Sequence, residues 1–262
     1  MDWLTSLPVG LLVGGWLLVA LFLAAAGRLV VGAIVPVGDH GGVLSIASPL
    51  MPALGATFAV MIAVTLSSEA SYLRSAQDVV SNEAEAASRL AWAATSPDIR
   101  TDPIHAALLD YMQSTRDTEW RGDSAANGDP ATEQTIKVLE GAVRIEAARA
   151  ELGTPASTEL PASLDAVTSY RRERLAAASR QIPVLYVVTL VAGGLALAVN
   201  AGALTIRSSR RTSLLVGGLA VVIGLSLALL ISLGAPWRGP LVASGGPIDH
   251  VVADLQSGFF SF

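Results

Sequence analysis

The sequence has no cysteine, only three histidines and a single lysine. Without cysteine, neither a disulfide framework nor a thiolate metal site can form. The histidines His40, His105 and His250 are isolated, and none has a second histidine or a glutamate at the spacing of a metal site. The glycine-rich phosphate loops and the nucleophile elbow of common enzyme classes are also missing. We therefore expect a protein that is not an enzyme and that holds no metal and no cofactor.

Charge is scarce as well, and it is unevenly distributed. Charged residues make up 15% of the 262 positions, against about 25% in a typical soluble domain. Thirty of them lie between Glu69 and Arg180, where 18 acidic residues face 12 basic ones. An acidic segment of this kind does not bind phosphate backbones, because such binding needs a basic surface. We therefore expect no nucleic acid among the partners of this chain.

Outside that segment, the chain consists largely of long apolar tracts. Four of them have the roughly 20 residues that are needed to cross a bilayer, and they cover 7–27, 43–66, 183–206 and 213–233. The first tract is not typical of a signal peptide, because its only early charge is the acidic Asp2 and its apolar run is too long. The pattern predicts an all-α membrane protein, in contact with membrane lipid, in which two pairs of transmembrane helices flank a polar helical domain.

The tracts divide the sequence into four parts. These are a first transmembrane pair (1–67), the polar domain (68–182), a second transmembrane pair (183–235) and a C-terminal tail (236–262). Within the polar domain, apolar residues recur at helical spacing and predict four helices. The first of these continues from the second span, because no helix-breaking residue separates them.

Glu83 lies on the apolar stripe of that first polar helix. A carboxylate in such a position needs a buried partner, or else it lies at the solvated edge of the stripe. Arg171 and Arg174, on the last polar helix, are candidate partners. The sequence leaves both interpretations of Glu83 open.

The arginines near the ends of the spans bear on the orientation of the chain in the membrane. On the side of the polar domain lie Arg74, Arg171, Arg172, Arg174, Arg180 and Arg238, and on the other side lie Arg28, Arg207, Arg210 and Arg211. The positive-inside rule gives a narrow preference for a cytoplasmic polar domain, although the dense basic turn at 207–211 argues the other way. We expect a multi-pass protein of the plasma membrane with its polar domain in the cytoplasm. We expect Arg28 to mark the membrane interface.

Small residues recur at four-residue spacing in the apolar tracts, which lets helix backbones approach closely in lipid. The two longest rows are Gly194, Ala198 and Gly202 in the third tract, and Ala220, Gly224, Ala228 and Ser232 in the fourth. A shorter pair, Gly10 and Gly14, lies in the first tract. Such rows are explained by packing within one chain or by contact between subunits, and packing within one chain is the simpler interpretation.

One side of the second tract is mildly polar. Thr57, Met61, Thr65 and Ser68 share this side, because they are three or four residues apart. These residues are candidates for the lining of a pore. The alternative is that the hydroxyl groups bond to carbonyl oxygens of their own helix, which is common in membrane helices.

Several short motifs along the chain resemble those of the bestrophin-like domain family. They are Glu83-Ala84 with Leu90, Tyr111 followed by Glu119-Trp120, Arg171 and Arg174-Leu175 before Pro183, and Pro236-Trp237-Arg238-Gly239 with Leu241 in the tail. The order of two spans, helical insert, two spans and tail agrees with that family. The chain differs in a glycine-rich first span and in lacking the charges that often precede the tail proline. We take Glu83, Tyr111, Glu119, Trp120, Arg171 and Arg174 as candidate structural residues of the polar domain.

The family is distantly similar to the bestrophins, which are ring-shaped ion channels. In those channels the second membrane helix lines a narrow neck and continues into a cytosolic helical domain, and the resemblance implies a similar build here. The leading hypothesis is a homo-oligomeric ion channel or pore that conducts inorganic ions, because one chain of four helices leaves no obvious aqueous path. The alternative is a non-conducting membrane scaffold or sensor whose helical domain binds a partner.

Overall fold

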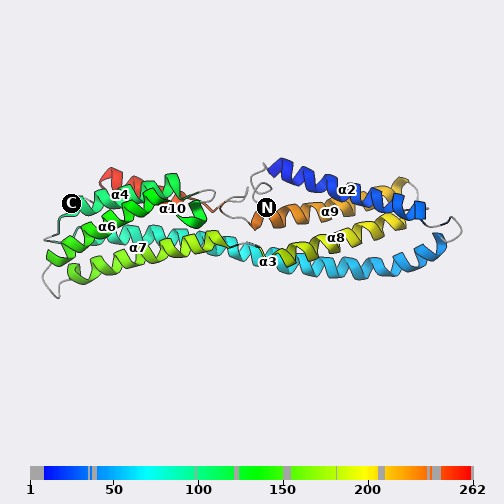
Figure 1. Cartoon of the computed structure of the whole chain (residues 1–262), viewed down its shortest axis with the longest axis horizontal. Coiled ribbons are helices and arrows are strands. Elements are labelled where there is room, and N and C mark those ends of the chain that lie inside the picture. The colour runs from blue at the N-terminus through cyan, green and yellow to red at the C-terminus, as the bar shows by residue number, and fades with distance from the viewer. Residues whose placement is uncertain are drawn as a thin grey trace. The chain divides into compact units, whose positions relative to one another are not determined.

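The computed structural model describes residues 9–34, 36, 40–97, 99–120, 124–149, 155–180, 182–205, 210–234, 237 and 243–260. Within this part of the chain the regular elements are all helices (Figure 1). In chain order they are α2 (Val9–Ile34), α3 (His40–Ala93), α4 (Thr101–Thr118), α5 (Ser124–Asn127), α6 (Pro130–Arg149), α7 (Pro155–Ser179), α8 (Val184–Leu204), α9 (Arg210–Leu233) and α10 (Gly246–Ser257). The helices form two compact units, and α3 contributes residues to both of them.

The first unit contains α2, α8, α9 and the part of α3 up to Ser71. Among the described residues, four helices are long and apolar enough to cross a membrane, in agreement with the four predicted spans. Large apolar side chains on this unit point outward, and Phe22 and Leu185, for example, are 71% and 72% exposed. Lipid tails accommodate such a surface, whereas water does not. Helix α2 continues six residues beyond Arg28, so this arginine lies inside the helix rather than at its end.

Helix α2 packs closely against α8 and α9, and glycines make this approach possible. A methyl group on Gly202 of α8 would lie 2.5 Å from the carbonyl oxygen of Ala24 in α2. A methyl group on Gly224 of α9 would lie 2.9 Å from the carbonyl oxygen of Trp16, which is also in α2. The backbones can therefore approach this closely only because these positions have no side chain, as is typical of helix pairs in lipid.

The other members of the two long rows of small residues are also buried within the chain. Ala198, Ala220 and Ala228 are at most 2% exposed, and an added methyl group on Gly194 would meet Ile223 and Phe58. The rows thus serve packing within one chain. In the shorter row, by contrast, nothing lies within 4 Å of a methyl group added to Gly10 or Gly14.

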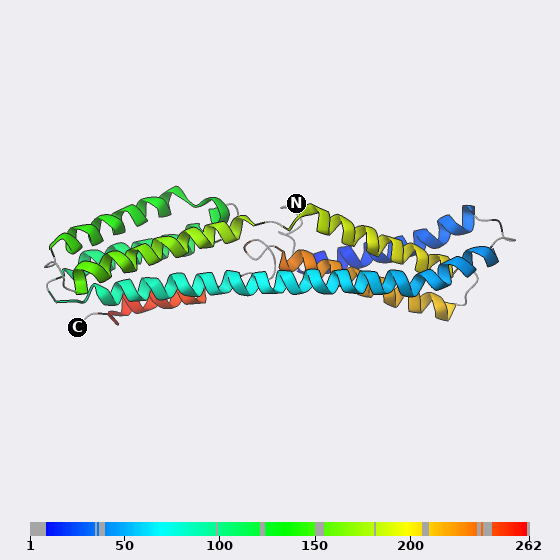
Figure 2. The same ribbon diagram turned by 90° about the horizontal axis from the view of Figure 1, so that it is seen from below.

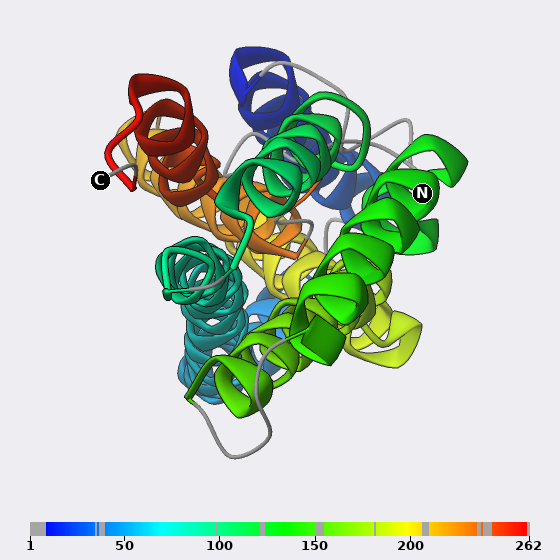
Figure 3. The same cartoon turned by 90° about the vertical axis from the view of Figure 1, so that its left-hand side faces the viewer.

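The second unit contains the rest of α3 together with α4, α5, α6, α7 and α10. Its core is apolar, with the large side chains Leu90, Leu108, Met112 and Leu139 fully buried. Seen end-on, α4 lies between α10 and α6, and α6 packs in turn against α7 (Figure 3). Four of these helices correspond to those that the apolar spacing predicts for the polar domain. The short α5, between α4 and α6, is a helix that the apolar spacing did not predict.

The C-terminal tail is helical in part and belongs to this second unit. Helix α10 lies against the bundle (Figure 2) and buries Ile248, Val251 and Val252 in the common core. Sequence analysis predicted no helix here and separated the tail, 236–262, from the polar domain. The amphipathic stretch is only 12 residues long, so its helical form depends on packing rather than on propensity.

Substitution of Gly224 by alanine tests the close approach of α9 to α2. We expect a loss of about 1–3 kcal/mol in the free energy of unfolding, since an added methyl group forces the α2 backbone to shift. Gly218→Ala in the same helix is the matched control, because nothing lies within 4 Å of its added methyl group. The control is expected to be neutral or slightly stabilising. Thermal unfolding of the full-length protein in mild detergent measures both, and equal melting temperatures would contradict the close packing.

Candidate functional site

The polar side of α3 within the first unit is divided between exposed and half-buried positions. Thr57 and Ser68 are exposed, whereas Met61 and Thr65 are half-buried. The Thr57 hydroxyl donates to the carbonyl oxygen of Ala53 at 2.9 Å, and the Thr65 hydroxyl donates to that of Met61 at 2.8 Å. Both donors therefore bond to their own helix, as the alternative interpretation of these residues expected. The hydroxyl oxygens keep lone pairs that can accept further hydrogen bonds.

This polar side borders the packed side of α3. Phe58 and Ile62 of α3 are buried against Leu190 of α8 and Leu227 of α9, and Met61 packs at the margin of this cluster. Thr57 and Ser68 thus lie at the boundary between the core and the open face of α3.

The open face itself carries mostly small side chains. Its exposed residues include the small Ala56, Ala59, Ala63 and Ser67, at helical spacing, together with the larger Val60 and Val64. A face of small residues allows a second helix to approach closely in lipid. Polar oxygens and small side chains therefore adjoin on the part of α3 that its own chain leaves uncovered.

In the second unit, Glu83 of α3 is fully buried and has partners on two other helices. The Nε atom of Arg174 in α7 lies 2.6 Å from Glu83 Oε2. The hydroxyl of Tyr111 in α4 donates to Glu83 Oε1 at 2.5 Å. Glu83 and Arg174 are each 0% exposed, so this is a buried ion pair rather than a carboxylate at the edge of the stripe. Of the two candidate partners of Glu83, the structure places Arg174 beside it.

Arg171, the other candidate, pairs with Glu119 instead. Its Nη2 atom lies 2.5 Å from Glu119 Oε1, and its Nε atom lies 3.2 Å from Oε2, which makes the contact bidentate. Arg174 also reaches Glu119, with Nη2 3.0 Å from Oε2. The backbone N–H of Asp129 donates to Glu119 Oε1 at 2.8 Å. Gly128, at a positive φ of 76°, makes the turn that brings this N–H to the carboxylate.

The cluster of Glu83, Tyr111, Glu119, Arg171 and Arg174 is electrically balanced. Two carboxylates face two guanidinium groups, and Tyr111 is held in its neutral form. Burial, and then repulsion from Glu83, raise the pKa of Tyr111 well above its ordinary value of 10.0. For Arg174, burial opposes the charge, but the carboxylates of Glu83 and Glu119 raise its pKa. The cluster therefore ties α3, α4 and α7 together without offering a free acid or base.

Trp120, next to Glu119, makes the contact with the tail. Its ring lies 5.4 Å from that of Trp237 in an edge-to-face arrangement, and it also faces Gly245, where a side chain would touch the indole. Gln77 of α3 accepts a hydrogen bond from the backbone N–H of Ser244 at 2.7 Å. Trp120 and Trp237, which belong to separate motifs in the sequence, therefore meet in space. Pro236, Arg238, Gly239 and Leu241 of the tail motif lie outside the described residues.

Sequence reasoning did not identify Asp129, Gln77 or the pairing of the two tryptophans. Asp129 contributes a backbone N–H, for which its side chain gives no signal. The turn sequence Asn127-Gly128-Asp129 is the feature that could have indicated a fixed loop beside the cluster. Among the described residues, no three histidine, cysteine, aspartate or glutamate side chains lie close enough together to hold a metal ion.

Replacement of Arg174 by methionine tests the role of the buried cluster. We expect a loss of about 3–5 kcal/mol in the free energy of unfolding of the second unit, because two buried carboxylates lose their shared cation. Glu133→Gln is the control, since it breaks an exposed pair with Lys137 at 2.7 Å and should leave stability unchanged. Denaturant unfolding of the full-length protein, followed by tryptophan fluorescence, measures both. Similar midpoints for the two variants would mean that the cluster is not buried.

Comparison with known proteins adds a family assignment to this geometry. No curated protein and no solved structure gives a significant match to the chain. A family model described as the bestrophin-like domain matches residues 17–248. This match includes most of the first candidate membrane helix, the whole of the other three and the buried cluster, and thus most of the chain. The chain therefore belongs to the bestrophin-like domain family.

Proposed function

We propose that this protein is a homo-oligomeric ion channel or pore in which α3 lines the conducting path. The copies surround a central axis, the first unit crosses the plasma membrane, and the second unit lies in the cytoplasm. Family membership supports a multi-pass membrane protein related to ion channels. Ion conduction, assembly into a homo-oligomer and the orientation in the membrane are our own proposals beyond this family relationship.

The observation that carries the proposal is the character of α3. It is a single helix of 54 residues that belongs to both units. Its part within the first unit leaves a face of small residues uncovered, with Thr57 and Ser68 at the margin. Such a face suits close approach of neighbouring copies, and hydroxyl oxygens can replace part of the hydration shell of an ion.

The need for several copies follows from packing. In the described part of the first unit, the space between the helices is filled by apolar side chains such as Phe58, Leu190, Leu197 and Leu230. An aqueous path through a single chain would have to displace this core. A path between copies requires no such change, because it uses surface that one chain leaves open.

A second candidate function, a scaffold or sensor, is favoured by α6. This helix of the second unit exposes Val138 and Ile145, at 53% and 54%. The two residues are seven positions apart and therefore share one face. Exposed apolar side chains at such spacing suit the docking of a partner.

Thr57→Phe tests the pore. A bulky apolar ring in the path is expected to lower ion flux into proteoliposomes by about tenfold or more, because it narrows and dries the constriction. Thr189→Phe in α8 is a closely matched control, since Thr189 is also exposed and its hydroxyl also bonds to its own helix, to Leu185 at 2.7 Å. The control should conduct like the unchanged protein. Normal ion flux through the Thr57→Phe variant would mean that α3 does not line the conducting path.

Native mass spectrometry in mild detergent tests the assembly. A central pore requires a closed ring, for which we expect four or more copies of the chain. A stable monomer or dimer would leave no axis for conduction and would favour the scaffold. In that case, Val138→Glu should weaken partner binding without changing the subunit count.

A further inference from the structure

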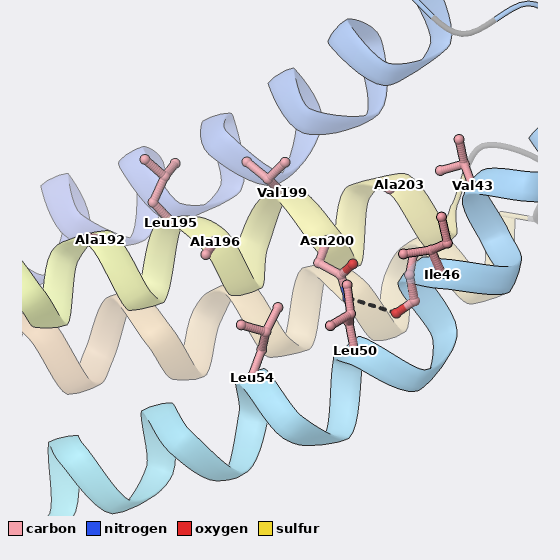
Figure 4. Close-up of a pocket in the computed structure, with 11 residues that line it drawn as sticks. Val43, Ile46, Leu50, Leu54, Ala192, Leu195, Ala196, Val199, Asn200 and Ala203 are labelled. Carbon is pink, nitrogen blue, oxygen red and sulfur yellow. Dashed lines mark hydrogen bonds between the residues drawn. The ribbon is translucent and has the colours of Figure 1, made fainter.

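A groove open to the surroundings runs between α3 and α8 in the first unit (Figure 4). It has a volume of about 570 Å³. Its walls are the apolar residues Val43, Ile46, Ala47, Leu50 and Leu54 of α3 and Ala192, Leu195, Ala196, Val199 and Ala203 of α8, together with Asn200. From Ala192 to Ala203 the groove is about 16 Å long, at the rise of an α-helix. The groove therefore runs parallel to the axes of the two helices.

Asn200 is the one polar side chain in this lining, and it has a definite orientation. Its Nδ2 atom donates to the carbonyl oxygen of Ala47 at 3.0 Å and approaches Met51 Sδ at 3.4 Å. Because a carbonyl oxygen can only accept, the amide nitrogen must face α3. The amide oxygen of Asn200 then has no donor among the described residues. A half-buried amide in a lipid-facing groove is costly unless something covers that oxygen.

The position of Asn200 places this acceptor near the end of a membrane span. It lies four residues before the end of α8 at Leu204, which is about 6 Å along the helix axis. In the sequence, the basic residue Arg207 follows shortly afterwards. One end of the groove is therefore polar and close to the membrane surface, whereas the rest is apolar and extends toward the interior.

The apolar walls and the one polar end of the groove distinguish between the possible occupants. An apolar helix from a second copy would cover the groove but would leave the Asn200 oxygen without a donor. A hydrocarbon chain is much narrower, and it runs from the membrane surface inward, as the groove does. The apolar walls and the polar end thus match a lipid molecule along its length.

We propose that this groove binds the acyl chain of a phospholipid whose headgroup donates a hydrogen bond to the Asn200 oxygen. The amide of Asn200 then bridges the Ala47 carbonyl on one side and the lipid on the other. The bound lipid fills the space that separates α3 from α8 at this end. Binding does not depend on whether the protein conducts ions.

The test compares two lipids in nanodiscs that contain the full-length protein. Palmitoyl-oleoyl phosphatidylethanolamine has N–H donors in its headgroup, and palmitoyl-oleoyl phosphatidylcholine has none. Native mass spectrometry after release into mild detergent counts the lipid that stays bound. We expect retained phosphatidylethanolamine, preferred over phosphatidylcholine by roughly threefold, as for one hydrogen bond within a membrane. In Asn200→Leu this preference should disappear. Equal retention of both lipids by the unchanged protein would overturn the proposal.

Ala196→Phe fills the groove and should abolish retention of either lipid. Ala25→Phe is the matched control, because Ala25 is an exposed residue of α2 outside the groove, and it should retain lipid normally. Size-exclusion profiles establish that both variants fold. Equal lipid retention by the two variants would mean that the lipid binds elsewhere.

A photo-crosslinking amino acid at Ile46, which is 63% exposed at the groove, identifies the occupant directly. We expect an adduct with the mass of a lipid. A covalent dimer in its place would assign the groove to a second copy of the chain and would overturn the proposal.

Discussion

The polar unit depends on the ion pairs that the buried guanidinium of Arg174 makes with two carboxylates. This guanidinium is fully enclosed and reaches Glu83 at 2.6 Å and Glu119 at 3.0 Å. A charge in a low-dielectric interior is tolerated only when opposite charges and hydrogen bonds surround it. Arg174 therefore fixes how α7 can sit against α3, and through Glu119 it also fixes the end of α4. Any slip between these helices would leave a charge buried without its partner.

The first unit is held together by a different means. In lipid, burying apolar side chains gives little advantage, so helices associate through close packing of their backbones. Gly202 and Gly224 provide this for α2. Helix α3 is the exception, because large side chains such as Phe58 and Ile62 make its contacts. The spacing that these side chains impose leaves a groove beside α8, and the far side of α3 remains uncovered.

Both proposals therefore concern α3, but they use successive stretches of it, residues 43–54 for the groove and Thr57 to Ser68 for the path. The side near α8 forms an apolar groove with a polar end, which suits a lipid. The uncovered side has small residues bordered by hydroxyl groups, which suits neighbouring copies around a path for ions. The helix also carries Glu83 in the polar unit. One wall of the groove, the uncovered face and Glu83 therefore all belong to one helix. A substitution at one of these sites can be tested for its effect on the other two.

The sequence alone predicted the class of the protein, its four membrane spans and the four long helices of the polar domain, because long apolar tracts and stripes at helical spacing are local properties of the chain. It also indicated the family, through motifs that can be read in order. It identified the members of the buried cluster but not the pairing, because helical spacing gives the face of a residue and not the partner opposite. Arg171 and Arg174 were equal candidates for Glu83, and only the packing of α7 assigned Arg174 to it.

Other features were decided by the tertiary structure for the same reason. A row of small residues can serve packing within a chain or between chains, and only the approach of α2 showed that Gly202 and Gly224 face inward. The tail contains too short an amphipathic stretch to predict a helix, and α10 exists because the bundle buries Ile248 and Val251. Asn200 had no local signal, since its importance arises from a carbonyl group more than 150 residues away in the sequence. Local pattern thus determined what each helix is, and long-range contact decided what each of its faces meets.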